Sequence, residues 1–362
     1  MKKILFLLGG IALVVGGVYF TRPASVSLPS SIMPASAPSA SNADKEKKYV
    51  RAPEFVNPSG FINTNGIALK DVVGSKVILV DFWTYSCINC QRTLPYLTAW
   101  YDKYKDQGLE IISVHTPEFA FEKKNENVAR AAKEFGINYP IIQDNDYATW
   151  NAYGNRYWPR KYLIDIDGYI VYDHIGEGAY EETERKIQEA LAERKARLKE
   201  EGEIARSTVD VAEEKTHARS PEIYFGAARN TNFGNGKKQT RGEQTLTTPE
   251  KITTDTLYLD GTWDFGEEFA QNRTAQAKIT FRYNAKNVFM VARADTPISL
   301  RILRDGIPIM ATVSGVDVAG GAATVRDDRL YHLVADPAGA GEHTLEIIVD
   351  SPGLQTFTFT FG

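Results

Sequence analysis

Cysteine is nearly absent from this 362-residue chain: there are two, Cys87 and Cys90. A disulfide-stapled scaffold needs more cysteines at wider spacing, so that class of protein is excluded. A closed structural zinc site needs four ligands, and neither a second cysteine pair nor finger-like spacing of the five histidines is present. An excess of positive charge is also missing, since the net charge is -4, so we expect no nucleic-acid partner.

Charge is missing from a long stretch of the N-terminus, where Met1-Lys2-Lys3 precedes an uncharged apolar run from Ile4 to Phe20. This run is longer than the apolar core of a cleavable signal, which spans about 7–15 residues. The positive-inside rule keeps the lysines in the cytoplasm and sends the rest of the chain outward. No cysteine follows the run, which excludes a lipoprotein anchor. We expect residues 1–21 to be an uncleaved membrane anchor, with a removed signal peptide as the alternative. Either way the domains lie in the periplasm or outside the cell.

Strand-like and helical segments alternate between residues 49 and 195, which is the pattern of an α/β domain. The preceding residues 22–48 are rich in Ser, Ala and Pro, and we expect a linker there because this composition buries too little apolar surface to order itself. The run from Lys76 to Phe82 is typical of a strand buried on both faces. The other expected elements are strands at 109–114, 162–165 and 169–172 and helices at 93–104 and 125–135.

The chain changes character twice beyond residue 195. Residues 196–219 are rich in charge and have little apolar face, so we expect a charged helical linker. From 220 to 362, short strands separated by Gly, Asp and Asn predict an all-β, jelly-roll-like sandwich. Its aromatic residues Trp263, Phe265 and Tyr283 either stack on sugar rings or fill the core, and their strand spacing favours the core. The clearest strands are 277–283, 288–293, 299–303, 343–349 and 356–361.

Two thiols with two residues between them, placed after a buried strand and at the start of a helix, have a specific chemical consequence. The first thiol lies at the helix N-terminus, where unpaired N–H groups and the helix dipole stabilise a thiolate. Cys87 is therefore the expected nucleophile, and Cys90, one turn deeper, is placed to resolve the mixed disulfide. This chemistry needs no cofactor beyond the redox-active Cys87–Cys90 pair. An inert disulfide and half of a zinc site are the alternatives.

Three more residues are candidates for the same site. Asp81 ends the buried strand, where a carboxylate has a raised pKa and moves protons for the resolving thiol, unless it is an ordinary solvated aspartate. Pro159 precedes the next strand, and its X–Pro bond is either cis, leaving backbone groups free for a substrate chain, or trans in a turn. Glu118 follows a strand at its carboxyl end, where α/β sites gather, and is either a second acid–base group or a surface carboxylate.

Together these residues resemble the thioredoxin superfamily, and more closely its exported TlpA/ResA-like branch. Val80-Asp81-Phe82-Trp83, followed by the dithiol, is similar to the thioredoxin strand and active-site loop, and this resemblance assigns Asp81 to the family's buried carboxylate. Trp158-Pro159 falls where the family carries its cis-proline, which implies a cis bond here. We also expect Trp83 and Trp158 to contact the substrate. Glu118 matches the glutamate that members of the branch carry near the dithiol.

A closer resemblance is to the C-terminal periplasmic part of DipZ-type proteins. It is carried by residues 81–97 and 144–151 and by Tyr157-Trp158-Pro159. In that family a thioredoxin-like domain is followed by a β-sandwich that resembles carbohydrate-binding modules, which implies glycan as a candidate partner of residues 220–362. DipZ proteins also carry a multi-span, CcdA-like electron-transfer domain ahead of this part, whereas here a single apolar segment stands in its place. The resemblance therefore implies a separate membrane electron donor.

The expected function is reduction of disulfides in exported proteins by a membrane-tethered thiol–disulfide oxidoreductase, because the TlpA-like branch mostly reduces. The uncharged pair Ile88-Asn89 does not by itself decide between reductase and oxidase. Two other functions are alternatives: a glycan- or cell-wall-binding protein with an accessory redox domain, and a thiol peroxidase. Thr84 and Cys87 have the peroxiredoxin spacing, but Val80 stands where that family carries a proline.

Overall fold

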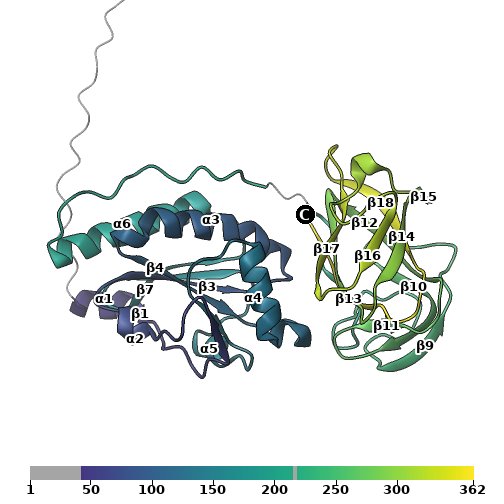
Figure 1. The fold of residues 1–362 in the computed structure, drawn as a ribbon, viewed down its shortest axis with the longest axis horizontal. Helices are drawn as coiled ribbons and strands as arrows, with labels where there is room; N and C mark the ends of the chain where they lie inside the picture. The colour runs from purple at the N-terminus through teal and green to yellow at the C-terminus, as the bar shows by residue number, and fades with distance from the viewer. Residues whose placement is uncertain (1–41, 215–217) are drawn as a thin grey trace, which may run out of the picture. The chain divides into compact units, whose positions relative to one another are not determined.

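The computed structural model describes residues 42–214 and 218–362 (Figure 1). The expected membrane anchor at 1–21 and the expected linker up to residue 41 lie outside the described residues. Across the two described ranges, no helix is both long enough and apolar enough to cross a bilayer. The end of the expected linker forms a short helix instead, α1 (Asn42–Lys48).

The α/β domain is built on a seven-stranded sheet in the order β1-β7-β6-β3-β4-β5-β2. The central neighbours β3, β4 and β5 run parallel, whereas β6 is antiparallel to β3 and β7 is antiparallel to β6. Every residue of β3 is buried, as its apolar sequence predicts. The strands are β1 (Val50–Arg51), β2 (Gly60–Ile62), β3 (Val77–Trp83), β4 (Leu109–His115), β5 (Ile141–Gln143), β6 (Arg160–Ile164) and β7 (Tyr169–Ile175).

Helices cover both faces of this sheet, and alternate residues of each strand face opposite sides (Figure 1). Leu79 packs in the core beneath α3, α4 and α6, whereas Val80 packs in the core beneath α2 and α5. The helices are α2 (Leu69–Val72), α3 (Ile88–Tyr104), α4 (Asn125–Glu134), α5 (Ala148–Ala152) and α6 (Tyr180–Leu198), with 3-10 turns η1 (Lys105–Gln107) and η2 (Ala120–Lys123). The strands and helices expected from the sequence in this domain are confirmed.

The expected helical linker at 196–219 is wrong beyond Leu198, where α6 ends. Lys199 adopts a left-handed conformation, and residues 200–214 contain neither helix nor strand. This segment packs along the α/β domain: the Val209 amide donates to Glu184 Oε2 at 2.8 Å, and the Ser207 carbonyl accepts from Gln188 Nε2 at 3.0 Å. Its sparse apolar side chains lie against the core, so packing determines its conformation more than helix propensity does.

The β-rich domain contains one 12-stranded sheet in place of the two separate sheets expected of a sandwich. The five strands that the sequence indicated most clearly are all present. The strands are β8 (Ile223–Tyr224), β9 (Gly242–Leu246), β10 (Leu257–Phe265), β11 (Ala270–Asn272), β12 (Ala277–Ala285), β13 (Asn287–Arg293), β14 (Ile298–Arg304), β15 (Ile307–Pro308), β16 (Ala322–Val325), β17 (Arg329–Ala335), β18 (Gly341–Val349) and β19 (Gln355–Phe361), with a 3-10 turn η3 (Ala311–Val313).

Strand β10 joins the two halves of this sheet. Its first part, up to Asp260, pairs with β12, whereas its second part, from Gly261, pairs with β9 and β11. Gly261 has φ +94°, a conformation that side chains with a Cβ rarely adopt, so glycine permits the change of direction. The sheet therefore curls, and side chains from both halves fill one core.

The aromatic residues considered for sugar stacking lie inside that core. Trp263 and Tyr283 are fully buried, and Phe265 is 1% exposed. The Trp263 indole donates to the Asp260 carbonyl at 3.0 Å, which satisfies its one polar group. The interpretation of these residues as core is confirmed.

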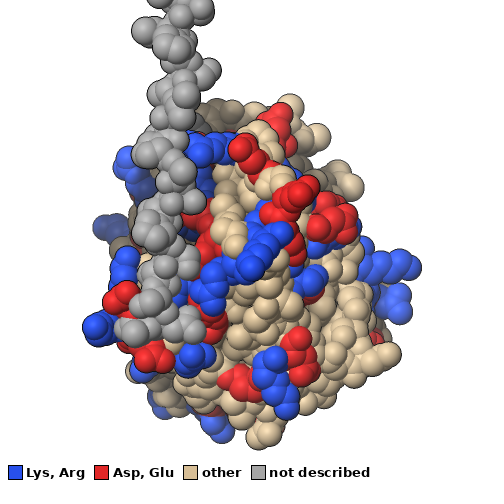
Figure 2. All heavy atoms as spheres, turned by 90° about the vertical axis from the view of Figure 1, so that its left-hand side faces the viewer, with Lys and Arg blue, Asp and Glu red and all other residues tan. Residues whose placement is uncertain are grey.

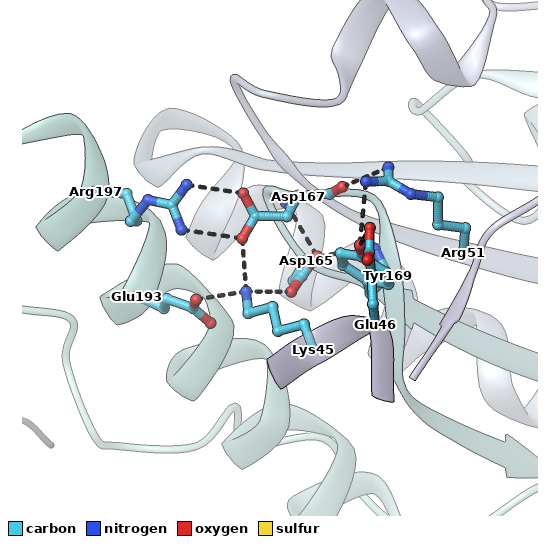
Figure 3. Close-up of polar contacts among 8 residues, drawn as sticks. All are labelled: Lys45, Glu46, Arg51, Asp165, Asp167, Tyr169, Glu193 and Arg197. Carbon is cyan, nitrogen blue, oxygen red and sulfur yellow. Dashed lines mark hydrogen bonds and ion pairs between the residues drawn. The ribbon is translucent and has the colours of Figure 1, made fainter. Parts of the chain in front are cut away.

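Acidic and basic side chains are interspersed on the face of the α/β domain near α1 and α6 (Figure 2). Beneath it, Lys45 of α1 is 4% exposed, and its Nζ lies 2.5 Å from Asp165, 2.8 Å from Asp167 and 2.6 Å from Glu193 (Figure 3). Arg197 adds two bonds to Asp167, at 2.9 and 3.1 Å. The ammonium takes the position that a metal ion would need between the three carboxylates. This cluster explains why α1 is ordered despite its polar sequence.

We expect Lys45→Met to lower the free energy of unfolding by about 3–5 kcal/mol, because it leaves the buried carboxylate of Asp165 without its cation. Urea denaturation followed by tryptophan fluorescence measures this loss. The matched control is Lys47→Met in the same helix, where the side chain is exposed and a change within about 0.5 kcal/mol is expected. Equal losses in the two variants would show that the cluster does not stabilise the domain.

Candidate active site

The two cysteines lie at the start of α3, shortly after the end of strand β3. Cys87 is the N-cap residue, and its Sγ accepts a hydrogen bond from the Cys90 amide at 3.3 Å. Its own amide donates to the Thr84 carbonyl at 3.3 Å. Both thiols are free, Cys87 is partly exposed, and Cys90 is 1% exposed. Cys87 is therefore the thiol that a substrate reaches first, with Cys90 behind it.

Cys90 needs a proton acceptor before it can react. Burial raises its pKa well above the ordinary value, and the hydrogen bond and charge of Cys87 raise it further. Because the thiolate is the nucleophile, a group able to take this proton has to lie nearby.

Asp81 is the buried carboxylate on the strand that leads to the dithiol. It is 1% exposed, and neither of its oxygens has a hydrogen-bond partner among the described residues. Burial raises its pKa to about 7, partly offset by the positive charge of Lys161. Its charge also contributes to the raised pKa of Cys90, which places the two groups in the same electrostatic environment. Asp81 thus has the position and the proton affinity of a base for Cys90.

Lys161 is a site residue that the sequence analysis missed. It lies directly across the β3–β6 ladder from Asp81 and is fully buried, and its Nζ donates to the Gly176 carbonyl at 3.1 Å. Burial lowers its pKa, whereas the charges of Asp81 and Cys90 act in the opposite direction. No local pattern marks Lys161, because it follows Arg160 at the start of β6, where two adjacent basic residues are typical of an exposed strand end.

A second buried carboxylate near the dithiol is Glu122, which the sequence analysis also missed. It is fully buried, and its oxygens accept hydrogen bonds from Ser86 and from the backbone amides of Glu118 and Phe119. Glu118, which the sequence indicated, points elsewhere: its Oε1 lies 2.8 Å from Arg229 Nη1 and 3.1 Å from the Tyr224 hydroxyl. The carboxylate bonded to the segment before Cys87 is therefore Glu122.

The ring of His115 contacts Thr84 and Tyr85, which lie between β3 and the dithiol. Its Nε2 lies 3.4 Å from the Tyr85 amide and from the Thr84 hydroxyl, and its ring stacks on Tyr85. Burial lowers its pKa to about 3, so it is neutral at physiological pH. Trp83 packs edge-on against the same ring and is fully buried. The expectation that Trp83 contacts the substrate is wrong, because the apolar core encloses its whole side chain.

Trp158 and Pro159 lie on the loop before β6, and the bond between them is cis, as the resemblance implied. The Trp158 indole donates to the Thr116 carbonyl at 3.1 Å and packs against Trp150 at a centroid distance of 4.3 Å. Part of the Trp158 side chain stays exposed. Its contact with a substrate stays a prediction.

Comparison with protein families matches the two domains separately. A model described as the AhpC/TSA family matches residues 50–173, and one described as a thioredoxin-like C-terminal domain matches residues 220–362.

Individual proteins are also similar to this chain. The chain is 39% identical over 314 residues to Protein DipZ of Mycobacterium tuberculosis, covering 86% of this chain and 43% of that protein. It is 35% identical over 144 residues to the thiol-disulfide oxidoreductase ResA of Bacillus thuringiensis, covering 39% of this chain and 79% of ResA. A solved thiol:disulfide interchange protein from Bacteroides sp. is 27% identical, with a TM-score of 0.33, over 38% of this chain and 89% of that one. The chain spans less than half the length of the DipZ relatives it matches.

The raised pKa of Asp81 sets the direction in which pH changes stability. Below about pH 4 the carboxyl is protonated in the folded and the unfolded chain alike. Between about pH 4 and 7 the unfolded chain has lost this proton and the folded protein keeps it, so rising pH favours unfolding, by a total on the order of 4 kcal/mol. We expect Asp81→Asn to be more stable than the wild type at pH 8, with the gain shrinking toward pH 4 in urea denaturation.

The exposed Asp106 offers a matched control for this series, since Asp106→Asn removes a carboxylate from the same domain without touching its core. No comparable gain at pH 8 is expected for it. A stability difference for Asp81→Asn that stays constant from pH 4 to pH 8 would contradict the assignment of Asp81 as a proton acceptor with a raised pKa.

Proposed function

The chain belongs to the thioredoxin-like thiol–disulfide oxidoreductases, and from that premise we propose that it reduces disulfides of exported proteins while its N-terminal segment holds it at a membrane. The observation that carries this proposal is the arrangement of the dithiol: a partly exposed Cys87 at a helix N-terminus, with Cys90 buried behind it and Asp81 buried beneath. An inert structural disulfide would need no carboxylate there, since burying one without partners is costly.

Reduction proceeds in two exchange steps at these residues. The Cys87 thiolate attacks one sulfur of the substrate disulfide, which forms a mixed disulfide and releases the other sulfur as a thiolate. Asp81 then takes the proton of Cys90, and the Cys90 thiolate attacks Cys87 Sγ. The second substrate sulfur leaves as a thiolate, and a Cys87–Cys90 disulfide remains. Two electrons have passed to the substrate, and the protein needs an electron donor to return to the dithiol.

The proposal that the protein is exported depends on the N-terminal sequence. The proposal of a membrane electron donor depends on the resemblance to DipZ-type proteins. The charge pattern of residues 1–21 supports an anchor with the folded domains outside the cytoplasm. We propose a membrane partner of the CcdA type as the source of electrons, as the resemblance to DipZ-type proteins implies. We propose no glycan-binding role for the β-rich domain, because its aromatic candidates Trp263, Phe265 and Tyr283 are buried.

We expect the full-length protein, equilibrated with glutathione and dithiothreitol buffers, to show one two-electron couple at or below about −240 mV. Such a value favours reduction of substrates over their oxidation. A potential well above about −180 mV would make the protein an oxidase or isomerase instead. Rapid turnover of hydrogen peroxide with no exchange activity would favour the thiol peroxidase alternative.

Two cysteine variants test the assigned order of attack. Cys90→Ser should accumulate the mixed disulfide between Cys87 and a protein substrate, because the resolving thiol is gone. Cys87→Ser should accumulate none, because Cys90 is buried. Mass spectrometry of non-reduced samples distinguishes the two outcomes, and adducts of similar yield in both variants would reject the order.

A further inference from the structure

We propose that Glu122 is a positioning residue for the exchange reaction: it holds the segment Thr84–Ser86, and through it Cys87, and it releases this segment when it takes up a proton. The proposal concerns thiol–disulfide exchange at Cys87 in either direction. It therefore stands or falls independently of whether the protein works as a reductase.

The geometry shows a carboxylate whose two oxygens serve two different loops. Oε1 accepts from the Ser86 hydroxyl at 2.6 Å and from the Ser86 amide at 3.3 Å. Oε2 accepts from the amides of Glu118 at 2.6 Å and of Phe119 at 3.0 Å. Glu122 is fully buried, so no water competes for these four bonds. One side chain thus ties the loop after β4 to the residue that immediately precedes the nucleophile.

Helix capping explains only half of this arrangement. A glutamate at the third position of a helix commonly bonds back to the N-cap amide, as Glu122 does to Phe119. The bonds to Ser86 reach across 36 residues of chain and contribute nothing to the cap. They act on a segment that Cys87 depends on, because the Cys87 amide donates to the Thr84 carbonyl.

Protonation of Glu122 would break this arrangement. Four donors point at the carboxylate, and a protonated carboxyl gains a donor and loses acceptor capacity, so at least one bond has to be lost. The longest is the one to the Ser86 amide, on the side of the dithiol. Burial raises the pKa of Glu122 to about 7, the Ser86 hydrogen bond acts against this rise, and the charge of Glu118 adds to it. Both protonation states are therefore populated near neutral pH.

Glu122 is a better candidate for proton uptake near neutral pH than the groups around it. His115 stays neutral because burial lowers its pKa to about 3, and burial raises the pKa of Tyr147 to about 12 and that of Tyr85 still further. Glu118 is paired with Arg229, and Glu268 accepts from the Ala120 amide at 2.9 Å. The titratable and charged groups that interact with Glu122 or with the residues bonded to it or next to it are Glu118, Tyr85, His115, Tyr147, Arg229 and Glu268.

The test is the rate at which iodoacetamide alkylates Cys87 between pH 5 and 9. It is measured in a Cys90→Ser, Asp81→Asn background, where Cys87 is the one remaining thiol and the titration of Asp81 is removed. We expect two inflections, one from the Cys87 thiol and one near pH 7. Glu122→Gln should remove the inflection near pH 7 and slow alkylation at pH 8 by about 2- to 12-fold, the range that one hydrogen bond contributes.

Two neighbouring variants should move the same inflection in opposite directions. Ser86→Ala removes a donor to the carboxylate and should shift the inflection to higher pH. Glu118→Gln removes a like charge and should shift it to lower pH. A uniform, pH-independent slowing in Glu122→Gln would overturn the proposal, since it is what a purely structural residue would cause. So would shifts of equal sign in the two neighbours.

A measurement without an altered Glu122 keeps the proposal testable if Glu122→Gln does not fold. In protein labelled with carboxyl-13C glutamate, the chemical shift of one glutamate carboxyl carbon should titrate near pH 7. The midpoint of this titration should move to higher pH in Ser86→Ala. Absence of any glutamate resonance that titrates between pH 6 and 8 would overturn the proposal. A potential typical of an oxidase would reject the proposed reductase function and leave this inference untouched.

Discussion

The burial of Asp81 is the constraint on which the rest of the active site depends. A carboxylate in the middle of a strand that is buried on both faces costs folding energy, because none of its oxygens finds a partner among the described residues. Lys161 lies across the ladder and lowers this cost with its charge, without a direct ion pair that would hold Asp81 permanently ionised. The result is a group that gains and loses a proton near neutral pH, next to a thiol that has to lose one.

The two buried carboxylates differ in how they are satisfied, and this difference separates their roles. No donor among the described residues bonds to Asp81, so its proton is free to move to and from Cys90. Glu122 has four donors, so its proton affinity is tied to the position of the backbone around it. A group without partners suits proton transfer, and a group with four partners suits positioning. The same side-chain chemistry thus serves two functions around one dithiol.

Local patterns allowed much of the fold and part of the site to be predicted. An apolar run predicted β3, and the thiol spacing beside a helix start predicted the roles of Cys87 and Cys90, because strand burial and helix polarity act within a few residues. Glu122 and Lys161 could not be found this way, since their partners Ser86 and Asp81 are distant in sequence. Composition suggested that residues 200–214 continue a helix, but packing against the α/β domain determines their conformation.

A fall in pH protonates both carboxylates, so it affects both of their roles at once. Asp81 must be ionised to accept the proton of Cys90, and Glu122 must be ionised to accept all four of its bonds. Both pKa values lie at about 7, so a fall in pH removes the base and loosens the loop over the same range. Exchange at this site therefore depends on pH more steeply than a single titrating group would allow. Because Glu122 bonds to Ser86 and Phe119 whereas Asp81 bonds to no described residue, each contribution is separable by a single substitution.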